Sequence, residues 1–328
     1  MKDESQRRPL GGGFSWRGLV GGGRWVDYGF AAVFVILVVV AAASSEFFFT
    51  QNNLTNIARQ MVANGLISVG MLVVILTGGI DLSVGAVVAL AGITASGLQA
   101  DLPLALAILI ALAVGSVAGT VNGFLVARFR LAPFIVTLAT LSAFRGLVFV
   151  YSDTPITPGD PSFRTLLGGG FIGPIPVPVI IMLMCYVAVW LFIGRTTPGR
   201  AIVAIGGNAE AVRLAGVNVR KHVVLAYLLS GFFSALAGVL LVSRLGIAQP
   251  NVGVGYELDA IAACVIGGAI LGGGGGSVVG VLGGVLTLGL IDNLLNLFNV
   301  QSYYQQILKG LIIVVAVLAR RVTKAEEF

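Results

Sequence analysis

Long apolar runs follow one another along most of the chain, separated by short polar or glycine-rich segments. A helix that crosses a bilayer needs about 20 mainly apolar residues, and the region from Tyr28 to Leu318 can be divided into such pieces. The pattern predicts ten crossings, at residues 28–45, 57–77, 81–98, 102–127, 131–150, 176–194, 222–243, 258–271, 277–297 and 303–319. The expected fold is an all-α polytopic membrane protein with a single transmembrane domain over 28–319.

Composition agrees with a lipid environment. Hydrophobic residues make up 57% of the 328 positions, charged residues only 10%, and the mean hydropathy is +0.99. Soluble domains carry about 25% charged residues. Cys185 and Cys264 both lie within apolar runs, where a thiol usually packs as a small hydrophobic group. We therefore expect neither a disulfide nor a metal site.

The basic residues predict the orientation in the membrane. Lys and Arg in short loops favour the cytoplasmic side, and most of the 20 basic residues satisfy this rule when the N-terminus is inside. Residues 1–27 are then a retained cytoplasmic tail, since the first apolar run is not followed by a convincing cleavage pattern. An even number of crossings places the C-terminal tail, 320–328, in the cytoplasm as well.

Two segments outside the predicted spans have distinct characters. The outer stretch 151–178 is rich in Pro and Gly, which predicts a short ordered cap or a docking surface at 151–175. The inner stretch 195–221 contains good helix formers from Ala209 to Ala215, with Asn208 as N-cap, Glu210 in the first turn and Gly216 at the end. It predicts a short cytoplasmic helix, and an ordinary solvated loop is the alternative.

Glycine is abundant, with 46 residues. Within "IGGAILGGGGGSVVGVLGG" it favours close approach of two helices and a mobile turn between them, and low sequence complexity is the alternative.

Enzymatic chemistry is not indicated by any motif. The only histidine, His222, lies at a cytoplasmic helix start, where a solvated role is the ordinary one. A P-loop needs a Gly-Lys pair before Ser or Thr, and no lysine of this chain follows a glycine. We expect a transport protein with no ATPase site and no cofactor of its own.

The polar residues within the spans favour a neutral solute. Ionisable groups are sparse there: Asp292 and Arg145 fall toward span ends, and Glu257 and Asp259 fall at a span start. Neutral hydrogen-bonding groups suit a sugar, and they equally suit contacts between helices. They comprise Asn64, Ser68, Thr94, Ser116, Thr120, Asn122, Thr137, Thr140, Thr287, Asn293 and Asn296.

Asp81, in "ILTGGIDLSVG", places a charge within an apolar region, which is costly in a bilayer. Gly78 and Gly79 predict the end of one helix, and Asp81 would then cap the next helix, assisted by Ser83. The cap either only fixes this helix break or also forms part of an inner gate. Arg145, in "LSAFRGL", is either an anchor or structural partner, or a group that hydrogen-bonds a sugar.

Several blocks, in order, carry a resemblance over almost the whole chain after residue 30. They are "NNLTNIARQ", "GMLVVILTGGIDLSVGAVVALAG", "PFIVTLATLSAFRGLVFVY", "PGRAIVAIGGNAEAVRLAGVNV", "AQPNVGVGYELDAIAACVIGGAILGGGGG" and "LLNLFNVQSYYQQILKGLIIVVAVL". Together they resemble the membrane subunit of bacterial ABC importers of the ribose-type monosaccharide class. The long glycine- and arginine-containing N-terminal extension departs from that family, and its role stays open.

The resemblance implies a partner set and a fold. The partners would be a second permease subunit, identical or paralogous, a cytoplasmic ATPase that binds the ATP, and a periplasmic sugar-binding protein. The fold would consist of two inverted halves of five helices in the bacterial inner membrane. A self-sufficient carrier for a small polar solute remains the alternative function, and a membrane enzyme is the third class considered.

The resemblance also extends the site assignment. Segment 195–221 corresponds to the part that seats in the ATPase. The residues expected there are Gly207, Asn208, Glu210, Arg213 and Gly216. The residues expected at the gate or along the pathway are Asn64, Thr77, Gly78, Gly79, Asp81, Ser83, Thr137, Thr140 and Arg145.

Overall fold

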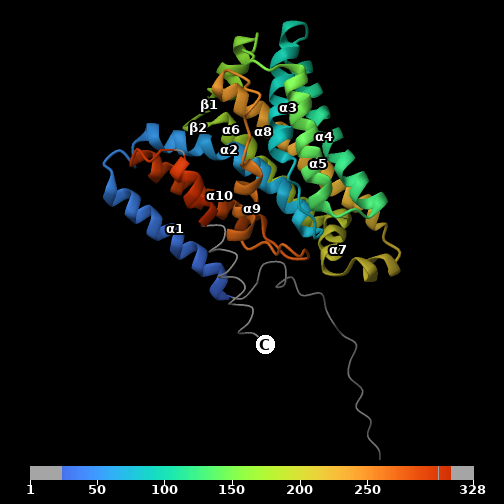
Figure 1. The fold of residues 1–328 in the computed structure, drawn as a ribbon. Helices are drawn as coiled ribbons and strands as arrows, with labels where there is room; N and C mark the ends of the chain where they lie inside the picture. The colour runs from blue at the N-terminus through green and yellow to red at the C-terminus, as the bar shows by residue number, and fades with distance from the viewer. Residues whose placement is uncertain (1–23, 302, 312–328) are drawn as a thin grey trace, which may run out of the picture.

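The computed structural model describes residues 24–301 and 303–311, with side chains described from residue 34 onward. Within this part the chain is predominantly helical (Figure 1). The predicted tail at 320–328, the end of the predicted span 303–319 and most of the predicted tail at 1–27 lie outside the described residues. The first helix, α1 (Arg24–Ser44), begins four residues before the predicted start at 28.

Among the described residues, six helices are long and apolar enough to cross a bilayer. They correspond to the spans predicted at 57–77, 102–127, 131–150, 176–194, 222–243 and 277–297. These helices are α2 (Gln51–Leu76), α4 (Leu104–Phe129), α5 (Pro133–Tyr151), α6 (Val177–Arg195), α8 (Val219–Leu245) and α10 (Val278–Leu297). The class of an all-α, multi-pass membrane protein is therefore confirmed.

Two of the other predicted spans are shorter than a crossing requires. Helix α3 (Val84–Gly97) continues into a 3₁₀ turn at Leu98–Ala100, and α9 (Tyr256–Ile266) has 11 residues. At 1.5 Å per residue α9 is about 16 Å long, roughly half of a bilayer's ~30 Å hydrocarbon core. Ten full-length crossings are thus not confirmed, and the prediction of a span over 258–271 is wrong at its end, because α9 stops at Ile266 and a glycine-rich turn follows.

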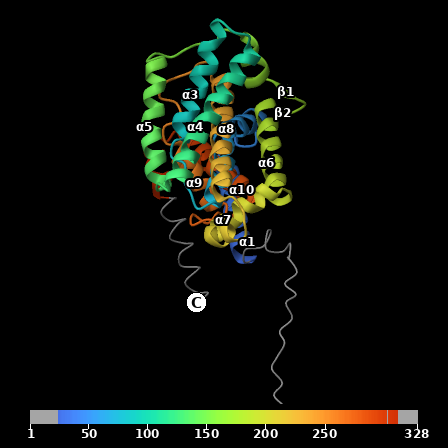
Figure 2. The ribbon, with the colours of Figure 1, turned by 90° about the vertical axis from the view of Figure 1, so that its right-hand side faces the viewer.

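Helix α8 forms the centre of the bundle, packed against α2, α3 and α4. Figure 2 shows α5 and α6 on opposite sides of it. Around α9 and α10 the glycines allow backbones to touch: a Cβ at Gly284 of α10 would lie only 2.1 Å from the Ala263 carbonyl oxygen of α9. The prediction of close helix packing in this glycine-rich motif is confirmed.

The two segments predicted to lie between the spans occupy opposite ends of the molecule (Figure 1). The stretch after α5 forms an ordered cap, with a π-helical turn at Phe163–Gly168 and a hairpin of β1 (Phe171–Ile172) and β2 (Ile175–Pro176). The other stretch contains α7 (Thr197–Leu214), which lies at the end of the bundle away from the cap.

Candidate functional site

The helix break after α2 is built by a Schellman motif. Gly78 has φ +84°, a left-handed conformation, and its N–H donates to the Ile75 carbonyl at 2.8 Å. The Gly79 N–H donates to the Val74 carbonyl at 3.3 Å, and the Thr77 hydroxyl donates to the same carbonyl at 2.7 Å. These bonds satisfy carbonyls that the helix end would leave unpaired. The prediction that Gly78 and Gly79 end the helix is confirmed.

The Asp81 carboxylate, only 1% exposed, is surrounded by neutral donors. Its Oδ1 accepts from the Ser83 backbone N–H at 3.1 Å and from the Ser83 hydroxyl at 2.7 Å. The Asn122 amide on α4 lies 3.5 Å from the same oxygen and donates to the Ser83 hydroxyl at 2.8 Å. The Ser230 hydroxyl on α8 donates to Oδ2 at 2.9 Å. Hydrogen bonds to an ionised acceptor are about twice as strong as neutral ones, so four such donors compensate the buried charge.

The predicted helix cap at Asp81 is wrong. Helix α3 begins at Val84, its N-cap residue is Ser83, and Ser83 makes no side-chain cap bond. Asp81 therefore lies too far before the helix to accept from its free N–H groups, and it obtains only one backbone donor. Asn122 was predicted as a polar helix residue without a link to Asp81, and Ser230 was not among the predicted site residues.

The carbonyl of Ile80 fixes the same turn to two further groups. The Tyr227 hydroxyl on α8 donates to it at 3.2 Å, and the Thr137 hydroxyl on α5 donates to it at 3.3 Å. Residues 77–83, which we call the aspartate turn, are thus attached to α4, α5 and α8. Thr140 lies one helical turn further along α5 and donates to the Val136 carbonyl of its own helix at 3.1 Å, so it does not join this set.

Arg145 is a structural partner. Its Nη1 donates to the carbonyls of Pro250 and Val252 at 2.6 and 2.9 Å, and Nη2 donates to that of Gly85 at 3.3 Å. The guanidinium fork holds the loop between α8 and α9 against the start of α3. These contacts agree with the structural alternative predicted for this residue.

Helix α7 consists of two helical pieces joined by a kink at Asn208, where φ is −159° and ψ is 95°. The Asn208 side chain accepts from the Ala211 N–H at 2.9 Å, and Gly216, with φ +82°, follows the helix end. The predicted cap and stop of the short helix are confirmed. The piece from Thr197 to the kink, for which no helix was predicted, is helical as well, and the Thr196 hydroxyl caps it.

The short helix after the kink is exposed. Glu210 and Arg213 form an ion pair although their side chains are 64% and 60% exposed. The hydrogen bond from Arg213 holds the pKa of the Glu210 carboxyl below its usual value. This helix therefore presents polar side chains, with no covering element among the described residues, at the end of the bundle.

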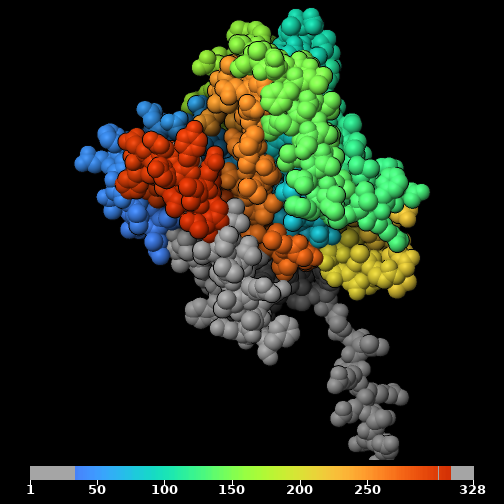
Figure 3. All heavy atoms as spheres, in the orientation of Figure 1, coloured from blue at the N-terminus to red at the C-terminus, as the bar shows by residue number. Residues whose placement is uncertain are grey.

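Gly206, just before the kink, touches the bundle with its backbone. A Cβ there would lie 2.0 Å from the Leu76 carbonyl oxygen and 2.3 Å from the Gly274 nitrogen. The Gly274 N–H itself donates to the Leu76 carbonyl at 3.1 Å. We call this three-way contact of Leu76, Gly206 and Gly274 the glycine junction. In Figure 3 the yellow surface of α7 adjoins the orange surface of the loop after α9.

Asn64 lies apart from the aspartate turn, twelve residues before Leu76 on α2, or roughly 18 Å along the helix. Its amide donates to Asp259 of α9 at 3.4 Å. Lys309 lies 3.1 Å from Asp259 and 3.1 Å from Asp292 of α10. These charges were not predicted to pair, although opposite charges within apolar segments are a signal for pairing.

Metal binding finds no support in residues 34–301 and 303–311, where no three His, Cys, Asp or Glu side chains lie close enough to hold an ion.

Comparison with known proteins gives consistent matches. The family described as "Branched-chain amino acid transport system / permease component" matches residues 53–317. The ribose import permease protein RbsC of Haemophilus influenzae is 48% identical over 82% of this chain and 84% of the relative. RbsC of Bacillus subtilis is 46% identical over 82% and 84%. The L-arabinose transport system permease protein AraH of Escherichia coli is 37% identical over 90% and 91%. No solved structure matches.

Proposed function

The chain belongs to the permease family that matches residues 53–317, and we propose that it is the membrane subunit of an ATP-driven ABC importer for a monosaccharide. It is a multi-pass protein of the bacterial inner membrane. Ribose is the substrate we assign first, because the relatives named for ribose are 46–48% identical and the one named for arabinose is 37% identical. Transport runs from periplasm to cytoplasm.

The proposal includes three protein partners and a topology. A cytoplasmic ATPase binds ATP, a periplasmic protein delivers the sugar, and a second permease subunit, identical or paralogous, completes the passage. Both termini are cytoplasmic, and the helices form two inverted halves of five. Helices α2 and α9 end in the same way, because each is followed two residues later by a glycine with a left-handed backbone conformation, Gly78 and Gly268. This similarity supports two related halves.

The exposed helix after the Asn208 kink, joined to the bundle by the glycine junction, carries this proposal. Gly207, Asn208, Glu210, Arg213 and Gly216 form the surface that seats in the ATPase. Closure of the ATPase on ATP would displace this helix. Because no side chain separates Gly206 from Leu76 and Gly274, the displacement reaches the end of α2 and the loop before α10 directly.

The aspartate turn is the element that this displacement would move. It follows Leu76 immediately, and its polar atoms are hydrogen-bonded to α4, α5 and α8. If the turn has two positions with different hydrogen-bond partners, it can act as an inner gate. The parts of this gate are Thr77, Gly78, Gly79, Asp81, Ser83 and Thr137. Thr140 and Arg145 support the surrounding helices, and Asn64 belongs to the pathway further along α2.

Retention of a tagged ATPase by the purified chain tests the docking surface. Glu210→Lys reverses a charge at the centre of the exposed helix, and Gly216→Pro alters its end. Both should reduce the ATPase that co-purifies, while Asp101→Lys, a charge reversal at the exposed turn before α4 and outside segment 195–221, should not. Unchanged retention by both variants, together with unchanged stimulation of ATP hydrolysis by the binding protein, would contradict the proposal.

A further inference from the structure

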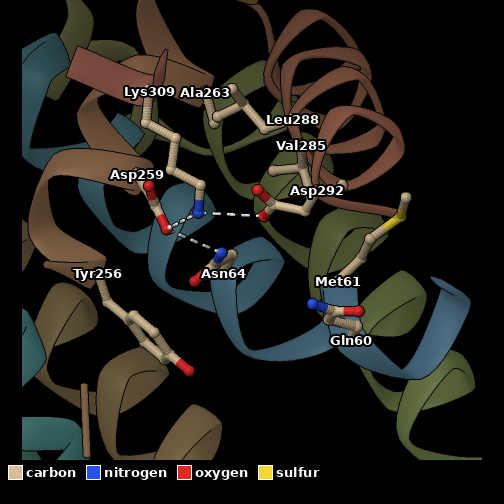
Figure 4. Close-up of a pocket in the computed structure, with 11 residues that line it drawn as sticks. Gln60, Met61, Asn64, Tyr256, Asp259, Ala263, Val285, Leu288, Asp292 and Lys309 are labelled. Carbon is tan, nitrogen blue, oxygen red and sulfur yellow. Dashed lines mark hydrogen bonds and ion pairs between the residues drawn. The ribbon is translucent and has the colours of Figure 1, made fainter. Parts of the chain in front are cut away.

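A polar cluster lies inside the bundle, where α2, α9, α10 and the helical segment 303–311 meet (Figure 4). Lys309 Nζ lies 3.1 Å from Asp259 Oδ2 and 3.1 Å from Asp292 Oδ2. The Asn64 amide donates to Asp259 Oδ2 at 3.4 Å. Ionisable groups within membrane segments are costly, and they commonly mark the path of a substrate. None of these four residues takes part in the aspartate turn or the glycine junction.

Two acceptor atoms of the cluster have no hydrogen-bond donor among the described residues. They are Asn64 Oδ1 and Asp292 Oδ1, both shielded from solvent, and Asp292 as a whole is only 8% exposed. A buried polar atom without a partner costs about 1–3 kcal/mol. A ligand that donates hydrogen bonds would remove this cost at both atoms.

The charges of the cluster select the kind of donor. One ammonium and two carboxylates leave the cluster negative, which disfavours an anionic ligand. Lys309 already lies between the two carboxylates, so a second cation would be repelled. Neutral hydroxyl groups fit both conditions, because they donate to carboxylate and amide oxygens. The lysine ammonium has three N–H donors, two of which face the carboxylates, and the third suits a ring or hydroxyl oxygen of the same ligand.

A cavity beside the cluster provides the space. Its volume is about 110 Å³, several times the ~10–15 Å³ that a single water needs on the same measure. Apolar side chains of Met61, Val285 and Leu288 form part of the wall, and the Tyr256 ring forms another part. A mainly apolar wall with a few convergent polar groups is typical of small-molecule sites.

We propose that this cavity is a binding site for the transported neutral sugar within the membrane subunit. The sugar hydroxyls donate to Asn64 Oδ1 and Asp292 Oδ1, and Lys309 donates to a sugar oxygen. The proposal rests on the function proposed above, and it places a point of substrate contact some distance from the aspartate turn. The permease would thereby contribute to the choice of substrate in addition to the binding protein.

Substrate protection of an introduced cysteine tests the site. Gln60 lines the cavity and is exposed, so Gln60→Cys provides a reporter at its rim. Labelling by a polar maleimide is measured in proteoliposomes that hold the complete complex, with and without D-ribose. We expect ribose to slow this labelling at least threefold and ribose 5-phosphate, an anion, to leave it unchanged. Asn52→Cys, exposed on the same helix and outside the cavity, should show no protection by either compound.

Two second-site variants identify the groups responsible. Asn64→Leu in the Gln60→Cys chain removes an acceptor at similar volume and should abolish the protection. Ser68→Ala removes a buried hydroxyl one turn further along α2, outside the cavity, and should preserve it. The unmodified chain gives the background from Cys185 and Cys264.

The labelling rate of Gln60→Cys is compared with and without ribose in two states of the complex, one without nucleotide and one with ATP and vanadate. Equal rates with and without ribose in both states would overturn the inference. ATP-driven ribose uptake is measured in the same vesicles. Uptake without protection would leave the proposed transport function standing and remove only the cavity site. Protection that persists in Asn64→Leu would equally refute the assignment of Asn64.

Discussion

Gly206→Ala is the substitution that tests the mechanical link between the ATPase surface and the transmembrane bundle most sharply. The added methyl group would lie 2.0 Å from the Leu76 carbonyl oxygen and 2.3 Å from the Gly274 nitrogen. Optimal contacts between heavy atoms are about 3.5–4.0 Å, so the two backbones must separate by more than about 1 Å. Neither obstacle is the end of a flexible side chain, and overpacking of this kind costs about 1–3 kcal/mol.

The assay is ATP-driven ribose uptake, with ATP hydrolysis measured in parallel. If the whole overpacking cost weakens the coupling between the ATPase docking helix and the transmembrane bundle, about 1–3 kcal/mol corresponds to roughly a 5- to 150-fold loss of uptake. Hydrolysis should fall less than uptake, because the ATPase keeps its docking helix while the displacement is no longer transmitted.

Gly194→Ala is the matched control. It is the same chemical change on α6, just outside the docking segment 195–221, and nothing lies within 4 Å of a Cβ there. This variant should transport like the parent complex. Equal uptake by the Gly206 and Gly194 variants, in complexes that retain the same amount of ATPase, would refute the glycine junction as a coupling element.

Three further predictions concern the aspartate turn, the Arg145 contacts and the docking helix. Asp81→Ala leaves several buried donors without an acceptor, at about 1–3 kcal/mol each, and should lower the melting temperature and abolish uptake, whereas Asp81→Asn keeps an acceptor and should retain more of both. Full uptake by an assembled Asp81→Ala complex would exclude a gating role. Arg145→Met removes three hydrogen bonds to backbone carbonyls and should speed proteolysis of the loop between α8 and α9, and an unchanged cleavage rate would count against this anchoring. Because Arg213 lowers the pKa of Glu210, their ion pair is fully formed above the ordinary glutamate pKa of about 4.3 and is lost only as pH falls through the lowered value. ATPase retention should therefore stay constant from pH 7 to 5, and a decline over that range would contradict this assignment.

Local signals allowed the helix ends to be predicted. Glycine at a left-handed position and asparagine before a run of helix formers act through neighbours a few residues away, so the Gly78 stop and the Asn208 cap could be predicted from sequence. The length of α9 could not be predicted from hydropathy, because the turn after it is itself apolar. Its sequence "GGAIL" prolongs the apolar run, although the helix has ended.

Partners from distant parts of the chain could not be predicted in the same way. Asn122 and Ser230 come to Asp81 from 41 and 149 residues further along, and no local pattern links them. The same holds for Asn64, Asp259, Asp292 and Lys309, which lie on four different helical segments. Burial of an unpaired charge indicated that compensating groups must exist, but only the packing of the helices identifies them.

Reconstitution of the purified chain in liposomes tests the central claim, that this subunit forms a passage whose work is done by a separate ATPase. Radiolabelled ribose is measured inside the vesicles with the chain alone, and again with the ATPase, the binding protein and ATP added. We expect accumulation above the outside concentration only in the complete system. Accumulation against a gradient by the chain alone would contradict the account.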